Sequence, residues 1–559
     1  MKTSVCGSAA ASACCARWIG AVLIALLLYA ASAMAGAAEK PDDGAERPRT
    51  RPNIVYILAD DLGYGDVRCY GGDRSKIPTP HLDRMAEQGM RFTDAHTCSS
   101  VCTPTRYGIL TGRYSWRSRL QKGVLYGDDP PLIAPDRLTV ASLLKRNGYT
   151  TVCLGKWHLG LGLPPRAASA DVRNNAAAGV DTSDGNAVAA PVSVAAAADR
   201  ADPWRFDYAG RIEHGPIQLG FDEFFGISAS LDMWPFAFIN NDRFDPVPTV
   251  EKKWIRTGPA AADFEAIDVM PKLAQRSVET IRRLAPAARD GKPFFIYLAL
   301  TAPHTPIVPT SAWQGKSGLG AYADFVMQVD DLVGQVLAAL DEANVAQDTL
   351  VFFTSDNGCS PQAKIEELVA AGHHPNGPLR GHKADIWEGG HRVPLIVRWP
   401  ARVPPGTRCD DPVCLNDLMA TCADVLNVKL PDDAGEDSES MLPMLLRTGG
   451  PRAERALVHH SVDGRFAIRH GKWKLALCPG SGGWSQPRDP QAARQGLPPM
   501  QLYDLETDLG EQTNLVEKHP EVARQLRQRL EQIVAEGRST PGAAQRNDVA
   551  VQIERPAGQ

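Results

Sequence analysis

Residues 53–63 have the sequence NIVYILADDLG, and this stretch decides the fold. The run from Asn53 to Leu58 is apolar and rich in β-branched side chains, which is typical of a parallel strand buried on both faces. Further runs of this kind lie along the chain, each bounded by polar or turn-forming residues. They are residues 150–154, 293–300, 349–353 and 394–397. We therefore expect these segments to form one buried sheet.

Helical patterns alternate with the predicted strands. Apolar residues from Tyr322 to Leu340 recur at helical spacing, so residues 321–343 should bury one helical face. Residues 138–147 and 270–284 show the same pattern. The alternation predicts an α/β fold, with a large, mixed but mainly parallel sheet flanked by helices. Ligands of such sheets bind beyond the carboxyl ends of the strands.

The length of 559 residues suggests one large domain and a smaller one. We expect the large domain over residues 51–446 and a small C-terminal α+β domain over residues 456–538, because short strand-like runs there precede an amphipathic helix at 520–535. Residues 164–202 are Ala-rich without apolar periodicity, which predicts a disordered surface insertion. We also expect the tail, residues 539–559, to be disordered.

The N-terminal residues 1–35 have the features of a signal peptide. Lys2 and Arg17 supply positive charge, and the apolar run 18–30 is followed by small residues that suit a cleavage site. An uncleaved membrane anchor is the alternative. Residues 36–50 are polar and predict a flexible lead-in. We therefore expect export to the periplasm, the medium or another extracytoplasmic compartment.

The charge and the cysteine content limit which partners, disulfides and metal sites are expected. The formal net charge is −5 and no Lys/Arg-rich block occurs, so nucleic acid is not an expected partner. Nine of the 12 cysteines follow the leader. An oxidising compartment would permit disulfides, but their pairing and the oligomeric state cannot be deduced from the sequence. No CxxC pair or His/Cys cluster has the spacing of a zinc site.

Polar loops follow two of the predicted strands. Asp60 and Asp61 follow the first strand, and Asp356 and Asn357 follow the strand at 349–353. Adjacent carboxylates repel unless a cation or another partner neutralises them. Each pair taken singly could instead cap a helix. Together, at two strand ends, they predict an all-oxygen site for Ca²⁺ or Mg²⁺.

Residues 98–113 have the sequence CSSVCTPTRYGILTGR. A lone cysteine is usually a small buried residue or half of a disulfide, so spacing alone does not make Cys102 catalytic. However, CTPTR followed by LTGR resembles the signature of the type I sulfatases, in the alkaline-phosphatase-like superfamily; the fourth position, often Ser in the family, is Thr105 here. The resemblance extends from Arg51 to Arg538. Its other stretches are PNIVYILADDLGYGD, GKWHLG, APHTP, FFTSDNG, GHKADIWEGGHRVP and QLYDLETDLGEQTNL.

This resemblance implies a hydrolase of sulfate esters with an alkaline-phosphatase-like fold. It implies that Cys102 is oxidised to formylglycine by a formylglycine-generating enzyme or an equivalent maturase. The implied ligands of one divalent cation, Ca²⁺ in preference to Mg²⁺, are Asp60, Asp61, Asp356 and Asn357. The implied catalytic residues are Cys102, Arg106, Lys156, His158, His304 and Lys383.

The family roles carry over to matching motif positions. Arg106 would hold the aldehyde hydrate and sulfate, and the hydrate would attack sulfur in line with the leaving alcohol. His304, assisted by Lys383, would protonate the leaving oxygen, and His158 would deprotonate the second hydroxyl so that sulfate is expelled. Lys156 would flank the nucleophile. A serine that touches sulfate in the family has no clear match, and the candidates are Ser228 and Ser230.

The substrate is less readable from the sequence than the reaction. Residues 208–243 combine aromatic and polar side chains, so we expect them to border the substrate pocket, with Asp232, Trp234 and Asn241 as candidate sugar contacts. A packed loop is the alternative. A sulfated carbohydrate is favoured over a small aryl sulfate. The rival functions are a phosphate or phosphonate ester hydrolase of the same superfamily and a non-catalytic carbohydrate-binding relative.

Overall fold

The computed structural model describes Met1 and residues 51–166, 202–448 and 455–555. The described residues from Arg51 to Arg555 belong to one compact unit. The predicted leader run at 18–30 and most of the Ala-rich insertion therefore lie outside the described residues. Across the described ranges, no helix is both long and apolar enough to cross a membrane.

The centre of the main sheet consists of the strands predicted from apolar runs. β1 (Asn53–Asp60) pairs in parallel with β10 (Thr349–Ser355) on one side and with β9 (Phe294–Pro303) on the other. β3 (Thr150–Lys156) pairs in parallel with β9, and β4 (Glu223–Ile227) with β3. Every residue of β1, β9 and β10 is buried, which explains why these strands are continuous apolar runs rather than alternating ones.

The edges of this sheet are partly antiparallel. β11 (Arg392–Arg398) runs antiparallel to β10, and β2 (Met90–His96) runs antiparallel to β11. The shorter edge strands are β12 (Thr407–Cys409), β13 (Val413–Cys414), β5 (Ile239–Asn240) and β6 (Arg243–Phe244). The sheet is therefore mixed and mainly parallel at its centre, as the sequence predicts.

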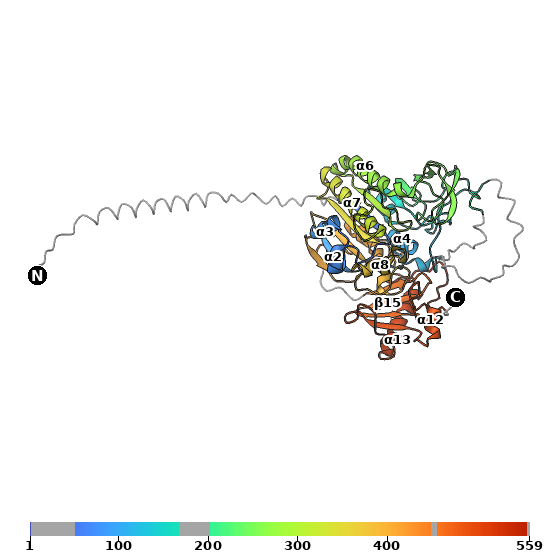
Figure 1. Ribbon diagram of the computed structural model, residues 1–559, viewed down its shortest axis with the longest axis vertical. Helices are drawn as coiled ribbons and strands as arrows, with labels where there is room; N and C mark the ends of the chain where they lie inside the picture. The colour runs from blue at the N-terminus through green and yellow to red at the C-terminus, as the bar shows by residue number, and fades with distance from the viewer. Residues whose placement is uncertain (2–50, 167–201, 449–454, 556–559) are drawn as a thin grey trace. The chain divides into compact units, whose positions relative to one another are not determined.

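Helices cover both faces of the main sheet. One group packs together and contacts β9 or β11: α3 (Pro80–Glu87), α6 (Val269–Arg289) and α7 (Ala321–Glu342). The other group is α4 (Cys102–Thr111), α5 (Val140–Arg146) and α10 (Leu418–Leu426). Figure 1 shows α6 and α7 side by side. The smaller elements are α2 (Arg68–Gly71), α8 (Ile365–Ala370), α9 (Glu388–His391), α11 (Leu442–Leu445), α12 (Asp489–Arg494) and the hairpin of β7 (Val250–Lys253) and β8 (Thr257–Ala260).

The C-terminal segment forms the predicted second sheet and helix. Its antiparallel strands, in spatial order, are β14 (Ala456–His460), β15 (Phe466–His470), β16 (Trp473–Ala476) and β17 (Gln501–Asp504). The helix α13 (Pro520–Ala535) packs against β15 and β16 (Figure 1). The amide of Ser100 donates to the carbonyl of His460 at 3.0 Å, so β14 lies beside the chain that leads into Cys102.

Residues 539–555 belong to the tail for which the sequence predicts disorder, and in this structure they make specific contacts. The Arg113 guanidinium holds both carboxylate oxygens of Asp548, at 3.0 and 3.1 Å, and Arg117 Nη1 donates to Asn547 Oδ1 at 2.9 Å. Both arginines are completely buried. Composition could not reveal this order because it depends on cations more than 400 positions earlier in the chain.

Candidate active site

The four predicted oxygen ligands meet at the carboxyl ends of β1 and β10. The register pairs Ala59 with Ser355, so the residues that follow these two strands lie side by side. The Asp61 amide donates to Asp356 Oδ1 at 3.2 Å, and Asn357 Nδ2 donates to Asp61 Oδ1 at 2.7 Å. Asp61 has a φ of 67°, a left-handed conformation that aspartate tolerates better than most residues.

Three basic side chains surround these carboxylates. Lys156 Nζ, at the end of β3, lies 2.9 and 2.8 Å from the two oxygens of Asp60. Arg106, on α4, donates from Nη2 and Nε to Asp356 Oδ2 at 2.8 and 3.1 Å. Lys383 Nζ lies 2.7 Å from Asp61 Oδ1. We call this group the site cluster: Asp60, Asp61, Asp356, Arg106, Lys156 and Lys383.

Burial and mutual charge set the protonation of the site cluster. Burial raises the pKa of Asp60, but Lys156, His304 and Arg106 together lower it further, so the net shift is downward. Burial and the neighbouring Asp60 raise the pKa of Asp356 to about 6. Burial lowers the pKa of Lys383, but Asp61 and the other acidic neighbours, Asp60 among them, together raise it by more, so this lysine stays charged.

The donor set fits a divalent cation. Ligand atoms of Asp60, Asp61, Cys102 and His304 all lie within 4.8 Å of one another. Asn357 Oδ1 is buried and has no hydrogen-bond partner among the described residues, which leaves an oxygen available for an ion. Carboxylate and amide oxygens are the ligands that Ca²⁺ and Mg²⁺ prefer.

Cys102 is the first residue of α4 and is only 2% exposed. Burial raises the pKa of its thiol to about 11, so an unmodified Cys102 is protonated at neutral pH in this structure. His304 follows β9, and its Nε2 lies 3.6 Å from Asp61 Oδ2. Cys102 and His304 thus both lie next to the carboxylates of Asp60 and Asp61.

His158 is prepared to accept a proton. Its backbone is left-handed, with a φ of 56°, and its Nε2 lies 2.7 Å from the carbonyl oxygen of Leu125. Since a carbonyl only accepts, Nε2 carries the proton and Nδ1 has a free lone pair. That Nδ1 is buried without a partner among the residues described. Burial, followed by the charge of Lys156, lowers the pKa of His158 well below its usual value.

A cavity of about 420 Å³ opens at this site. Four of the predicted catalytic residues line it: Cys102, His158, His304 and Lys383. Arg106 and Lys156 are fully buried and do not line it. Their contacts to Asp356 and Asp60 show that in this structure they hold the carboxylates rather than face the cavity.

Comparison with known proteins decides the family. The Sulfatase family model matches residues 52–428. The chain belongs to the sulfatase family. It is 31% identical over 532 residues to the N-acetylgalactosamine-6-O-sulfatase of Bacteroides thetaiotaomicron, covering 86% of this chain and 93% of that protein. It is 31% identical over 507 residues to arylsulfatase A of Bos taurus, covering 86% and 87% of the two chains.

A solved structure supports the same assignment. A Bacteroides thetaiotaomicron sulfatase, described under the metabolism of multiple glycosaminoglycans, superposes with a TM-score of 0.71 at 30% identity. The match covers 87% of this chain and 99% of that one. The predicted family, the α/β fold and the sulfuric ester hydrolase activity are confirmed. Metal binding and formylglycine are implied by the family.

The three predicted sugar contacts of this sulfatase differ in their position relative to the cavity. Asp232 lines it, and its Oδ2 is paired with Arg256. Trp234 does not line it; this residue belongs to the main hydrophobic core and packs over Gly258. Asn241 is an exposed turn residue with a φ of 58° whose Oδ1 accepts from the Phe224 amide at 3.0 Å. In this structure, therefore, neither Trp234 nor Asn241 lines the cavity, whereas Asp232 does.

Of the two candidate serines, only Ser230 lines the cavity of the sulfatase. Other cavity residues were not predicted from the sequence. They are Arg256, Gln362, His382, Trp484 and Arg488, among others. The position of His382 next to Lys383 was a usable signal. Trp484 and Arg488 had none, because they come from a C-terminal loop about 100 residues away from that motif.

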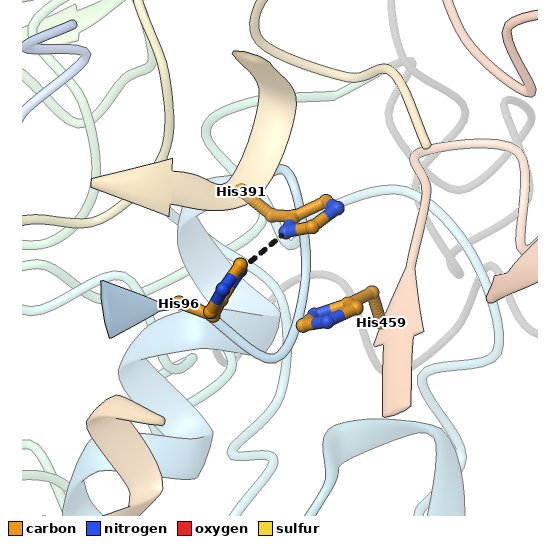
Figure 2. A group of neighbouring side chains, drawn as sticks. All are labelled: His96, His391 and His459. Atoms are coloured by element: carbon orange, nitrogen blue, oxygen red, sulfur yellow. Dashed lines mark hydrogen bonds between the residues drawn. The ribbon is translucent and has the colours of Figure 1, made fainter. Parts of the chain in front are cut away.

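A second group of possible metal ligands in the sulfatase lies between the two sheets. Figure 2 shows His96, His391 and His459, which come from three separate elements. The rings of His391 and His459 are stacked, with centroids 3.9 Å apart and planes inclined by 10°. An imidazole lone pair lies in the ring plane, so stacked rings do not direct their lone pairs at one ion. In this arrangement the three histidines do not form a metal centre.

Charged side chains enclose these histidines. His96 Nε2 lies 2.7 Å from Asp94 Oδ1, and Lys474 Nζ lies 3.0 Å from Glu388 Oε1. Burial is the first cause that lowers the pKa of each of the three histidines, so they are neutral. We call this group the interface cluster: Asp94, His96, Glu388, His391, Arg392, His459, Arg469, Lys474 and Glu511.

Proposed function

We propose that this sulfatase removes 6-O-sulfate from an N-acetylgalactosamine-type sugar of a glycosaminoglycan. The relatives support this choice of substrate: two are named for the 6-sulfate of N-acetylgalactosamine, and the similar solved structure is described under glycosaminoglycan metabolism. A cavity of about 420 Å³ is in the range that accommodates small ligands.

One observation supports the reaction best. Cys102 shares its cavity with His158, His304 and Lys383, at the edge of the buried carboxylates. A formylglycine at position 102 would supply a hydrated aldehyde as the nucleophile. A divalent cation, which we propose to be Ca²⁺, would supply Lewis-acid stabilisation of the sulfate charge; its ligands would be Asp60, Asp61, Asp356 and Asn357.

The protein's own side chains have complementary tasks. His158 Nδ1 has a free lone pair and accepts a proton at the nucleophilic residue. His304 and Lys383 lie on Asp61 and line the cavity, so they can donate to the leaving oxygen and hold the negative charge of the ester. Arg106 and Lys156 keep Asp356 and Asp60 ionised and oriented.

We also infer that the protein acts outside the cytoplasm after cleavage of residues 1–35. The support is the charged, apolar and small-residue order of that segment. A formylglycine-generating enzyme or an equivalent maturase would be its partner during export. N-terminal sequencing of protein from the extracytoplasmic fraction tests this inference, and a mature protein that begins at Met1 would contradict it.

The function is tested by assaying matched sulfated and unsulfated sugars, with aryl sulfate and aryl phosphate esters as references. We expect release of sulfate from the 6-sulfated amino sugar and slower turnover of the phosphate ester. Cys102→Ala should lower kcat/KM by at least about 10⁴-fold, as removal of a nucleophile does in other hydrolases. Mass spectrometry of the peptide that contains residue 102 should show the aldehyde. Full activity of Cys102→Ala, or an active preparation with an intact thiol, would refute the proposal.

A further inference from the structure

The C-terminal part of the chain contributes one wall of the catalytic cavity. Trp484 and Arg488 line the same cavity as Cys102, although they lie in the loop of residues 478–488 that precedes α12. This loop is outside the span matched by the family model, which ends at residue 428. Family membership therefore does not say what the loop binds.

The loop is held rigidly against the turn that bears Lys383. Asp385 is completely buried, and its Oδ1 accepts from the amides of Trp484 and Ser485, both at 2.9 Å. Its Oδ2 accepts from the His382 amide at 3.0 Å. A side chain at Gly483 would lie 2.3 Å from the carbonyl oxygen of Ala384, so the two backbones are in close contact. The wall is thus positioned before any substrate arrives.

Arg488 is a cation of this cavity without an ion pair among the described residues. By contrast, Arg256 pairs with Asp232, and Lys383 pairs with Asp61. The carboxylate of Asp489, the next residue, is taken by Arg465. Asp463 is close enough for Arg488 to lower its pKa, but it forms no ion pair with it. The guanidinium of Arg488 therefore remains available for a carboxylate or sulfate, which it can bind with two parallel hydrogen bonds.

Trp484 adds an aromatic face beside this cation. It is half-buried against an apolar cluster that includes Val101 and Val124, both of which also line the cavity. An aromatic ring fixed in this way offers a flat apolar surface, and the apolar face of a sugar packs well on such a surface. The pair thus combines a surface for a sugar ring with a site for an anion.

We propose that Arg488 binds a second anionic group of the substrate while Trp484 packs against the sugar that bears it. The substrate class is therefore an oligosaccharide with a carboxylate or second sulfate ester on the sugar next to the scissile ester. This inference rests on the proposed function, because it assumes that the scissile ester lies at Cys102. It adds that the C-terminal loop selects polyanionic chains over singly charged sulfates.

The test compares Arg488→Gln with Arg494→Gln. Arg494 is exposed on the adjacent helix α12 and does not line the cavity, so its replacement removes the same charge without touching the proposed contact. The substrates are a doubly sulfated disaccharide, a disaccharide with one sulfate and one uronate, and 4-methylumbelliferyl sulfate. Kinetics for the two disaccharides show whether the second group is a sulfate, a carboxylate or either.

We expect Arg488→Gln to raise KM about tenfold for a doubly charged disaccharide, the loss of one charge-assisted contact, with kcat nearly unchanged. Its kcat/KM for the aryl sulfate should stay within about twofold, and Arg494→Gln should match the wild type throughout. Trp484→Leu, which keeps apolar bulk, should raise KM about threefold to tenfold for both disaccharides. Equal losses on the disaccharides and the aryl sulfate, or no loss on either, would overturn the inference.

Binding separates this inference from the proposed function. Calorimetric titration of the doubly charged disaccharides into Cys102→Ala protein requires no turnover. We expect the Kd to rise about tenfold when Arg488→Gln is added to this background. If no sulfate ester is hydrolysed but this rise occurs, the proposed function fails and the anion site stands. If esters are hydrolysed and Kd does not change, the anion site is refuted.

Discussion

The site cluster and the interface cluster are built from similar side chains. Each has three carboxyl groups and three Lys or Arg side chains, the interface cluster adds three histidines, and each cluster is almost completely buried. They differ in where their polar atoms point. Beside the site cluster, Asn357 donates to Asp61 while its own Oδ1 has no partner within the described ranges, and Lys383 of the cluster lines a cavity.

In the interface cluster the groups face one another. Lys474 bridges Glu388 and Glu511, and the rings of His391 and His459 stack. Nε2 of His459 also lacks a hydrogen bond within the described ranges, yet it does not line the cavity at Cys102. The difference teaches that a set of buried charges does not identify a catalytic centre. Convergence of those charges on a cavity does.

The largest expected effect comes from breaking the interface cluster. Lys474→Met leaves Glu511 buried without its cation and removes one of the two cations that pair with Glu388, the other being Arg392; burial already raises the pKa of Glu511 to about 7. The free energy of unfolding should fall by about 3–5 kcal/mol, the usual cost of breaking a buried ion pair. Chemical denaturation measures it. The kcat/KM of the folded enzyme should stay within about twofold.

Lys472→Met is the matched control for this prediction. Lys472 immediately precedes the same strand, β16, but its side chain is 38% exposed and pairs with Asp504 at 2.7 Å. Its loss should leave the free energy of unfolding close to the wild-type value, since exposed ion pairs are weak. Equal destabilisation by the two variants would show that the buried ion pairs of Lys474 do not stabilise the fold more than an exposed ion pair does.

Breaking the site cluster should lower the catalytic rate and leave the stability nearly unchanged. Lys383→Met removes a cation that lines the cavity and lies 2.7 Å from Asp61. We expect kcat to fall about 10²- to 10³-fold, because a fixed charge at the developing oxyanion is lost. In saturating Ca²⁺ the stability should change little, since Asp61 would keep the ion as its partner. Steady-state kinetics and thermal melts measure the two quantities, and a variant that loses stability but keeps its kcat would contradict the comparison.

The sequence predicted those parts of the structure that depend on local pattern. The apolar runs of β1, β9 and β10 and the periodicity of α7 were sufficient to predict the elements and their burial. The four predicted ligand residues at the ends of β1 and β10 followed from the rule that parallel strands end at one edge. The candidate catalytic side chains at Cys102, His158 and His304 needed the family resemblance, because a lone cysteine or histidine has no local signature.

The remaining features depend on contacts between distant segments. β2 alternates weakly and is placed at the edge by β11, which lies about 300 residues later. The three clustered histidines lie far apart in the sequence, with His391 295 positions after His96 and His459 a further 68 positions on, so zinc-type spacing could not reveal them. The same holds for Arg488 in the cavity. Such features are fixed by tertiary packing, which no window of the sequence contains.

Acidification should distinguish the two clusters by a smaller effect. His96, His391 and His459 stay neutral because burial lowers their pKa values, and Lys474 opposes the protonation of His391 and His459. Unfolded histidines bind protons below about pH 6.5. The unfolded state then binds more protons than the folded state, so the free energy of unfolding decreases as the pH is lowered. Between pH 7 and pH 5, His391 and His459, whose pKa values lie well below the usual value, should each cost about 2 kcal/mol.

His459→Phe tests this prediction, since phenylalanine can keep the stacked position on His391 but does not titrate. The loss of unfolding free energy between pH 7 and pH 5 should shrink by about 2 kcal/mol relative to the wild type. Denaturant titrations at pH 7, 6 and 5 give the slopes. Lys472→Met should show the wild-type slope. A His459→Phe slope equal to that of the wild type would mean that this histidine is protonated in the folded protein.

The smallest expected effect concerns an ion pair that belongs to neither cluster. Asp548 accepts two hydrogen bonds from the buried Arg113, but its own side chain is 50% exposed. Because water screens that carboxylate, Asp548→Asn should lower the free energy of unfolding by less than about 1 kcal/mol. Its kcat/KM should equal that of the wild type. The difference in stabilisation between this ion pair and the buried ion pairs of Lys474 would then come from the partial exposure of Asp548 and not from the number of hydrogen bonds. A loss of unfolding free energy as large as that of Lys474→Met would instead show that this contact of the tail stabilises the fold as much as the interface cluster does.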